Sequence, residues 1–203
     1  MVVILKEKIL NTQINIIKNK KNLNDEELEI IKYGLESLYL TITKIVIILI
    51  LSSILNIFKE TILIILFYNS IRLFAFGLHA KNSIECLITS ITLFIGGPYL
   101  AIHININIII KIILLIINLI LIIIYAPADT EKRPLINPNK RKKFKKLSIL
   151  TSLILSIFTI YNHNNYISNL MLVGYTEATI MILPITYKLF KLPYNNYKNY
   201  KSE

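Results

Sequence analysis

Residues 106–125, INIIIKIILLIINLILIIIY, decide the fold class, because they carry a single charged side chain, that of Lys111. A helix of about 20 residues covers roughly 30 Å, which is the thickness of the hydrocarbon core of a bilayer. A soluble domain has no need of such a long apolar segment, and 54% of the 203 residues are hydrophobic. The stretch therefore predicts a helix that crosses a membrane.

Apolar segments of similar character lie on both sides of this stretch. They cover residues 38–58, 61–78, 84–102, 147–161 and 166–190. The chain is therefore predicted to be all-α, a polytopic membrane protein with about six transmembrane helices within residues 38–190.

The N-terminal segment differs from these spans. Residues 1–36 mix isoleucine and leucine with lysine and asparagine, which is typical of an amphipathic helix on a membrane surface. Asn24, followed by Asp25 and two glutamates, predicts that a helix starts there. Residues 191–203 are predicted to be a cytoplasmic tail, and we expect residues 1–203 to form a single integral membrane domain.

The net charge of +11 is distributed unevenly along the chain. Lysine and arginine cluster within residues 6–32, 132–146 and 188–201, beside the apolar spans, as expected of cytoplasmic segments. This distribution favours the lipid bilayer as a partner and argues against nucleic acid. With six crossings, both termini and the loops 79–83 and 126–146 are predicted to lie in the cytoplasm, in a multi-pass protein of the cell membrane.

Three cationic side chains lie within apolar segments. Lys44 and Lys111 are near span ends, so we expect their ammonium groups to reach the membrane interface. Arg72 is costly in a membrane and therefore more informative. It could pair with Glu36 or Glu177, bind a substrate carboxylate, or reach the inner interface.

The segment with the most chemistry is Arg72-Leu-Phe-Ala-Phe-Gly77-Leu-His79-Ala80-Lys-Asn-Ser-Ile-Glu85-Cys86. Cys86 is the only cysteine, so an internal disulfide is excluded. A cysteine nucleophile must be a thiolate, which a neighbouring histidine and a helix N-terminus both favour. His79 and Cys86 are therefore the candidate catalytic pair.

The spacing of this pair sets a geometric condition. Seven residues of one helix rise by about 10.5 Å, too far for a histidine to contact a thiol. A working pair needs a reversal between the two residues, and Gly77 supplies flexibility there. Asn82 and Glu85 have the spacing of a capping box, which predicts that Cys86 lies near the start of the next helix.

Less specific interpretations of the pair stay open on these residues alone. His79 could be an interfacial histidine and Cys86 a small buried side chain. A zinc site would lack further ligands, so neither a metal nor another cofactor is expected.

A family resemblance adds to these arguments. The pattern Arg72-x4-Gly77-x-His79-Ala80-x5-Cys86 resembles that of the AgrB family, accessory gene regulator protein B of Gram-positive quorum sensing. The similarity continues along the chain at Tyr33-Gly34-Leu35-Glu36, Tyr125-Ala126-Pro127-Ala128, Arg141-Lys142-Lys143, Glu177-Ala178 and Leu183-Pro184. One departure is the single Gly77 after Phe76, where many members have a second glycine or a polar residue.

The resemblance implies a function. AgrB-like proteins are membrane cysteine endopeptidases that remove the C-terminal tail of an AgrD propeptide and promote its cyclisation to a thiolactone or lactone, the precursor of an autoinducing peptide. His79 and Cys86 match the catalytic pair, and Arg72 and Gly77 match positions needed for activity. Members are homodimers, so the resemblance implies a homodimer here.

Other roles are hypotheses from residue type and position. The basic loop, with Lys142 and Lys143, could hold an acidic tail of the propeptide by charge. Glu36 and Glu177 are candidates for orienting the histidine. The alternative function is a membrane transporter or exporter of the signal peptide without catalysis, in which Gly96-Gly97-Pro98 would break a helix at a binding site.

Overall fold

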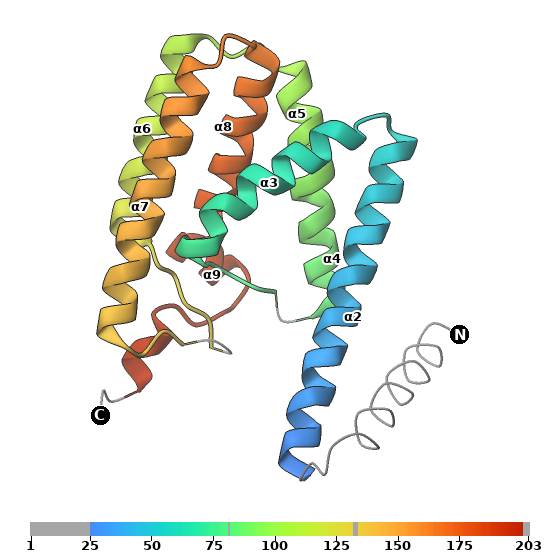
Figure 1. Cartoon of the computed structure of the whole chain (residues 1–203), viewed down its shortest axis with the longest axis vertical. Helices are drawn as coiled ribbons and strands as arrows, with labels where there is room; N and C mark the ends of the chain where they lie inside the picture. The colour runs from blue at the N-terminus through green and yellow to red at the C-terminus, as the bar shows by residue number, and fades with distance from the viewer. Residues whose placement is uncertain (1–24, 81, 132–133, 201–203) are drawn as a thin grey trace. The chain divides into compact units, whose positions relative to one another are not determined.

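The computed structural model describes residues 25–80, 82–131 and 134–200, and the regular elements within these ranges are helices (Figure 1). They are α2 Asp25–Ile54, α3 Phe58–Ala75, α4 Ser83–Ile91, the π-helical turn η1 Thr92–Gly96, α5 Gly97–His103, α6 Ile108–Tyr125, α7 Pro138–Tyr161, α8 Asn165–Ile180, α9 Pro184–Leu189 and the 3-10 turn η2 Asn196–Asn199. The all-α prediction is confirmed.

Three helical segments are long and apolar enough to cross a membrane, namely Ser83–His103, Ile108–Tyr125 and Pro138–Tyr161. The first of them contains α4, η1 and α5 in sequence, so Gly96-Gly97-Pro98 does not break the helix. The π-helical turn just before Pro98 absorbs the local irregularity.

Several predicted boundaries differ from those observed. The residue before the predicted helix start, Asn24, lies outside the described residues. Helix α2 runs without a break from Asp25 through residue 36 into the predicted first span. Most of the predicted amphipathic segment lies outside the described residues. The basic loop is partly helical, because Asn137 accepts hydrogen bonds from two backbone N–H groups and starts α7 at Pro138. The predicted sixth span ends early, since Pro184 starts a separate short helix.

The chain divides into two compact units, residues 1–50 and 51–203. In the first, the described residues belong to α2, whose Ile42, Ile45 and Val46 are exposed apolar side chains. In the second, α3 packs on α7 and α8, and α6 packs on the same two helices. Gly174 of α8 allows this close approach, because a Cβ there would lie 3.1 Å from the Cβ of Phe67.

Helix α6 has its polar side chains inside and its apolar side chains outside. Lys111, Leu115, Asn118 and Ile122 are buried at helical spacing. The opposite face exposes isoleucines: Ile109, Ile113, Ile116, Ile120 and Ile124. Helices in lipid typically have polar groups that form hydrogen bonds to neighbouring helices, and they have an apolar outer surface.

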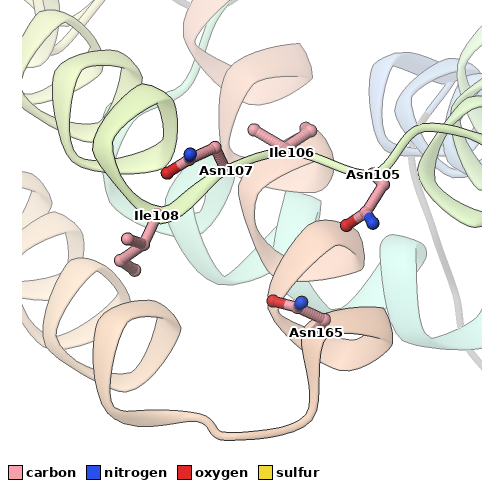
Figure 2. A pocket seen from close by; sticks show the side chains of 5 residues that line it. All are labelled: Asn105, Ile106, Asn107, Ile108 and Asn165. Carbon is pink, nitrogen blue, oxygen red and sulfur yellow. The ribbon is translucent and has the colours of Figure 1, made fainter.

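The side chain of Lys111 lies inside the helix bundle, and the expectation that its ammonium group reaches the membrane interface stays a prediction. The side chain is only 1% exposed, and Nζ donates to Oδ1 of Asn165 at 3.1 Å and to Oγ of Ser168 at 3.0 Å. Asn165 also lines a pocket of about 370 Å³ at this end of the bundle, where Asn105 and Asn107 contribute further amide groups (Figure 2). Lys111 is therefore held by polar groups of α8 rather than by solvent.

Three segments meet at the other end of the second unit. They are residues 76–80 after α3, residues 126–131 after α6, and the chain after α8. Backbone hydrogen bonds join them directly, as described below. This arrangement is consistent with the prediction that the C-terminal segment lies on the same side as the loops near residues 79 and 126.

Candidate active site

The chain leaves the helical conformation between the two predicted catalytic residues. Helix α3 ends at Ala75 and α4 begins at Ser83. His79 lies in the non-helical segment and is exposed, whereas Cys86 is the fourth residue of α4 and is half-buried. The expectation that no single helix carries both residues is therefore confirmed. Direct contact between their side chains stays a prediction.

Two residues with positive φ end α3 and redirect the chain. Phe76 has φ 58° and Gly77 has φ 115°, which only glycine adopts readily. The N–H of Gly77 then donates to the carbonyl of Ala128 at 2.8 Å, and the N–H of Leu78 donates to the carbonyl of Met181 at 3.0 Å. Bonds to two distant segments thus fix the backbone just before His79.

Arg72 ties the same segment to α3. Its Nη2 donates to the carbonyl of Leu78 at 2.9 Å and lies 3.4 Å from that of Gly77. The guanidinium also lies over the ring of Tyr68, 5.4 Å from its centroid. Nη1 is buried and has no hydrogen-bond partner among the described residues. Arg72 is therefore placed to fix the backbone that carries His79.

Gly77 is required by space as well as by φ. A Cβ at this position would lie 2.8 Å from the carbonyl oxygen of Met181, 3.0 Å from Nη1 of Arg72 and 3.1 Å from Cγ2 of Ile182. The first of these atoms belongs to the backbone and cannot swing away. The turn therefore has no room for a larger residue.

Cys86 lies at the start of its helix, as expected. Asn82 has the extended conformation of an N-cap residue, and its carbonyl accepts the N–H of Cys86 at 3.0 Å. The capping box itself is not formed, because the Asn82 side chain caps no backbone N–H and instead donates to Glu85 at 3.3 Å. The helix dipole can still favour a thiolate in this first turn.

Tyr68 of α3 is an aromatic residue of this region with three ionisable neighbours. The phenol lies within electrostatic range of Arg72, Glu177 and Cys86, and its ring packs edge-on against Phe94 at 5.1 Å between centroids. Tyr68 is itself buried. The sequence does not mark Tyr68 as a site residue, because an aromatic residue in an apolar span is ordinary. Its one signal is that it lies four positions before Arg72, which places the two residues on one face of the helix.

Glu177 of α8 lies against the irregular part of the third span. A Cβ on Gly97 would overlap the carboxyl group of Glu177, so a larger residue here would require that carboxyl group to move. Thr61 of α3 donates to the carbonyl of Phe94 within the same π-helical turn at 3.0 Å. Oε2 of Glu177 is buried and has no hydrogen-bond partner within the described part of the chain.

A basic cavity of about 460 Å³ lies close to the segment that carries His79. Arg141, Lys142 and Lys145 line it together with Tyr194, whereas Lys143 is not among its lining residues. Burial raises the pKa of Tyr194 to about 12, so its hydroxyl remains a donor at physiological pH. The cavity therefore offers cationic and hydroxyl groups to an anion.

Two contacts join neighbours of the cavity-lining residues to the segment that carries His79. The ring of Phe144, between Lys142 and Lys145 on α7, packs edge-on against Phe76 at 4.9 Å. Ala128, which bonds to the same segment, follows directly after the lining residue Pro127.

The carboxylate of Asp129 organises this region. It accepts backbone N–H groups of Leu135, Asn196 and Tyr197 and lies 3.9 Å from Nη1 of Arg141. The guanidinium of Arg141 in turn stacks on the ring of Tyr197 at 3.5 Å. These contacts join the segment after α6, the start of α7 and the C-terminal segment.

Comparisons with known proteins identify the family of this chain. The family model of accessory gene regulator B (AgrB) matches residues 10–182. An AgrB-like protein of Clostridium acetobutylicum is 35% identical over 187 residues, which are 91% of this chain and 90% of the relative. The chain belongs to the AgrB family. The accessory gene regulator protein B of Staphylococcus aureus is 36% identical over 170 residues, 83% of this chain and 89% of the relative. No solved structure gives a significant match.

Membership of the AgrB family assigns the chain to accessory gene regulator quorum sensing, and its long apolar helices make it a membrane protein. Within this AgrB chain, the structure brings Arg72 and Gly77 together and packs Glu177 against Gly97. It does not show Glu177 orienting His79. Glu36 lies in α2, and its side chain is outside the described part.

Two residues of this region were not predicted as site residues, namely Tyr68 and Gly97. Gly97 carried a local signal, since Gly96-Gly97-Pro98 was recognised as an interruption. Which of the two glycines faces a neighbouring helix could not be read from the sequence. The structure assigns that role to Gly97, because nothing lies within 4 Å of a Cβ on Gly96.

Proposed function

We propose that this AgrB family member is a membrane cysteine endopeptidase that removes the C-terminal tail of an AgrD-like propeptide and promotes ring closure of the remainder. The observation that carries the proposal is the helix break between His79 and Cys86, fixed by bonds to Ala128 and Met181. An exposed histidine on a fixed turn and a cysteine in a first helical turn suit nucleophilic catalysis.

In the first step, the Cys86 thiolate attacks the scissile carbonyl carbon of the propeptide. His79 has taken the thiol proton, and it returns a proton to the amine nitrogen as the C–N bond breaks. The tail leaves with a new amino terminus, and the rest of the propeptide remains as a thioester on Cys86. The step consumes no external proton, oxidant or reductant.

In the second step, a thiol or hydroxyl of the propeptide attacks this thioester and gives its proton to His79, while the C–S bond to Cys86 breaks and Cys86 leaves as the thiolate. The product is a thiolactone or lactone, and the enzyme is restored. For a thiol nucleophile one thioester replaces another, so the exchange has little free-energy cost. Hydrolysis competes with ring closure, and a half-buried Cys86 beside apolar helices limits the access of water.

The basic cavity supports the choice of substrate. We assign Lys142 to binding of an acidic tail, together with its cavity neighbours Arg141 and Lys145, because three cations attract carboxylates and steer their approach. Lys143 belongs to the same basic segment and adds to the local positive potential. A cytoplasmic location of this end, six crossings and a homodimer are further parts of the proposal.

Reconstitution of the chain with its propeptide tests the catalytic step. Cys86→Ala and His79→Ala should abolish tail removal, while a thiol trap should detect the peptidyl thioester only when Cys86 is present. The expected loss is several orders of magnitude, since nucleophile and base act as a unit. Persistent tail removal in both variants would refute peptidase activity and leave peptide export as the alternative.

Charge removal on the basic segment tests tail binding separately. Lys142→Gln should raise the KM for the propeptide by about 3- to 10-fold, the effect of losing one charge-assisted hydrogen bond that remains partly hydrated. Lys143→Gln is the matched control, because Lys143 does not line the cavity, and it should change KM less. Equal KM values in both variants and the wild type would exclude the cavity as the tail site.

A further inference from the structure

The C-terminal segment, residues 191–200, forms part of the wall of the basic cavity. Tyr194, Asn195 and Tyr197 line the cavity together with the basic residues of α7 named above. The chain after α9 runs beside the start of α7 (Figure 1). The segment lies beyond residues 10–182, which match the AgrB family model, so family membership gives it no role. Its place at the cavity therefore needs an explanation of its own.

Asp129 fixes the backbone of this segment. Its carboxylate accepts the N–H of Asn196 at 3.1 Å and the N–H of Tyr197 at 2.8 Å. Asn196 is buried, and Asn195 before it has φ 56°, a left-handed conformation that asparagine tolerates. The backbone beside the cavity is therefore held by a buried carboxylate.

The guanidinium of Arg141 is positioned by contacts that leave its hydrogen-bond donors unused. It lies over the ring of Tyr197, 3.5 Å from the ring centroid, and Nη1 lies 3.9 Å from Oδ2 of Asp129. A distance of 3.9 Å gives an ion pair but is too long for a hydrogen bond. Nη1 is buried on the Asp129 side, whereas the side chain as a whole is 21% exposed and lines the cavity. The group is therefore fixed on one side and accessible on the other.

The hydroxyl of Tyr194 is a second donor at the same cavity. Its ring packs edge-on against Tyr187 at 5.0 Å between centroids, which holds the side chain in place. With a pKa raised by burial to about 12, the hydroxyl keeps its proton at physiological pH. It makes no hydrogen bond within the described residues. Two directed donors, on α7 and on the C-terminal segment, thus line one accessible cavity.

We propose that the C-terminal segment is part of the tail-binding site, where Arg141, positioned by Tyr197, and the Tyr194 hydroxyl bind one carboxylate of the acidic tail. This inference rests on the proposed function and names the group that the cavity recognises. Lys142 and Lys145 contribute positive charge in general, whereas Arg141 and Tyr194 contribute donors of defined direction.

The donors and charges of the cavity favour a carboxylate. Its two oxygens match the fork of a guanidinium, and their remaining lone pairs can accept from a hydroxyl. None of the described residues that line the cavity is acidic, so an anion meets no like charge in its wall. The volume of about 460 Å³ has room for an acidic side chain and the backbone on either side of it.

The test compares propeptides that differ in a single charge of the tail. The probe is a synthetic AgrD-like propeptide in which one Asp or Glu of the tail at a time is replaced by Asn or Gln. Binding is measured to Cys86→Ala protein in phosphatidylcholine bicelles, so that no cleavage takes place and no anionic lipid competes. One replacement should weaken binding by about 10- to 100-fold, the range for lost hydrogen bonds between charged groups. This factor is the carboxylate penalty.

The carboxylate penalty should depend on the Tyr194 hydroxyl. Tyr194→Phe, made in the Cys86→Ala protein, removes only this oxygen and should reduce the penalty about 3- to 10-fold. Tyr200→Phe is the matched control, because Tyr200 is exposed on the same segment and does not line the cavity, so the full penalty should remain. A penalty that Tyr194→Phe leaves unchanged would overturn the proposal.

The positioning role of Tyr197 is tested by a pair of variants in the same protein. Tyr197→Leu removes the ring beneath Arg141 but keeps the backbone N–H that Asp129 binds, and it should reduce the carboxylate penalty. Tyr197→Phe retains the ring and should retain the penalty. Equal penalties in these two variants would contradict the proposal. If Tyr197→Leu does not fold, the Tyr194→Phe comparison still decides the outcome.

Failure of this inference is distinguishable from failure of the proposed function. If wild-type protein does not cleave the propeptide, the endopeptidase proposal fails, whatever the binding results are. If Lys142→Gln weakens tail binding but no carboxylate penalty depends on Tyr194, the cavity remains the tail site and this inference fails. If Tyr194→Phe instead lowers binding of phosphatidylglycerol vesicles and leaves tail binding unchanged, the cavity takes a lipid phosphate and the inference is refuted.

Discussion

Gly77→Ala is the most direct test of how the turn before His79 is fixed. Gly77 has φ 115°, and an added Cβ would lie 2.8 Å from the carbonyl oxygen of Met181. The same Met181 carbonyl accepts the N–H of Leu78, so moving it away breaks a bond that holds the turn. Alanine therefore strains the backbone and displaces its neighbour together.

The magnitude follows from these two effects. A residue with a side chain in a sparsely populated backbone conformation costs about 1–3 kcal/mol. Overpacking against a well-filled neighbour costs about 1–3 kcal/mol more. The sum, about 2–6 kcal/mol, is a large fraction of the stability of a typical domain. We expect the turn to shift rather than to retain this strain, and the shift would displace His79. A displacement of about 1 Å at a reacting group reduces activity about 100-fold.

Stability is measured by thermal unfolding in detergent micelles, and activity by tail removal from the propeptide in liposomes. Gly96→Ala is the matched control, because nothing lies within 4 Å of a Cβ there and its φ of −64° is helical. That variant should be as stable and as active as the wild type. If Gly77→Ala behaves like Gly96→Ala in both assays, the argument about the turn is incorrect.

Three further substitutions test other contacts. Arg72→Lys should reduce tail removal at least 10-fold, because an ammonium cannot hold the turn carbonyls and retain the geometry of the guanidinium fork; activity near that of the wild type would contradict its positioning role. Gly97→Ala should lower the melting temperature, because the added Cβ overlaps the carboxyl group of Glu177. Adding Glu177→Asp to the same chain withdraws that carboxyl group and should restore part of the lost melting temperature. The absence of any rescue would exclude this overlap as the cause. Asp129→Ala should destabilise the fold by about 2–4 kcal/mol in thermal unfolding, because it leaves buried N–H groups without an acceptor, whereas the exposed Glu131→Ala should have little effect.

Much of the local structure could be predicted from the sequence. Hydrophobic runs of sufficient length gave the all-helical membrane fold, and the rise per residue required a break between His79 and Cys86. Asn82 was correctly predicted as the residue before the next helix, because local backbone preference decides such positions. Its side chain nevertheless bonds to Glu85 rather than to the backbone, a choice between competing contacts of similar energy.

Contacts between distant residues could not be predicted in the same way. The hydrogen-bond partners of Lys111, Asn165 and Ser168, lie more than 50 positions along the chain from it. Whether a lysine in an apolar helix is buried depends on which helix packs beside it. A residue pattern within one helix contains no information on that neighbour.

The sequence by itself determined that the chain is helical, lies in a membrane and changes direction between His79 and Cys86. These properties depend on the hydrophobic length of each segment and on the fixed rise of a helix, which are local. Only the tertiary structure decided what fixes that turn: backbone bonds of residues 77 and 78 to Ala128 and Met181, and the guanidinium of Arg72. It also placed Glu177 against Gly97 and within reach of Tyr68, because the packing of α3, α5 and α8 determines which buried groups meet.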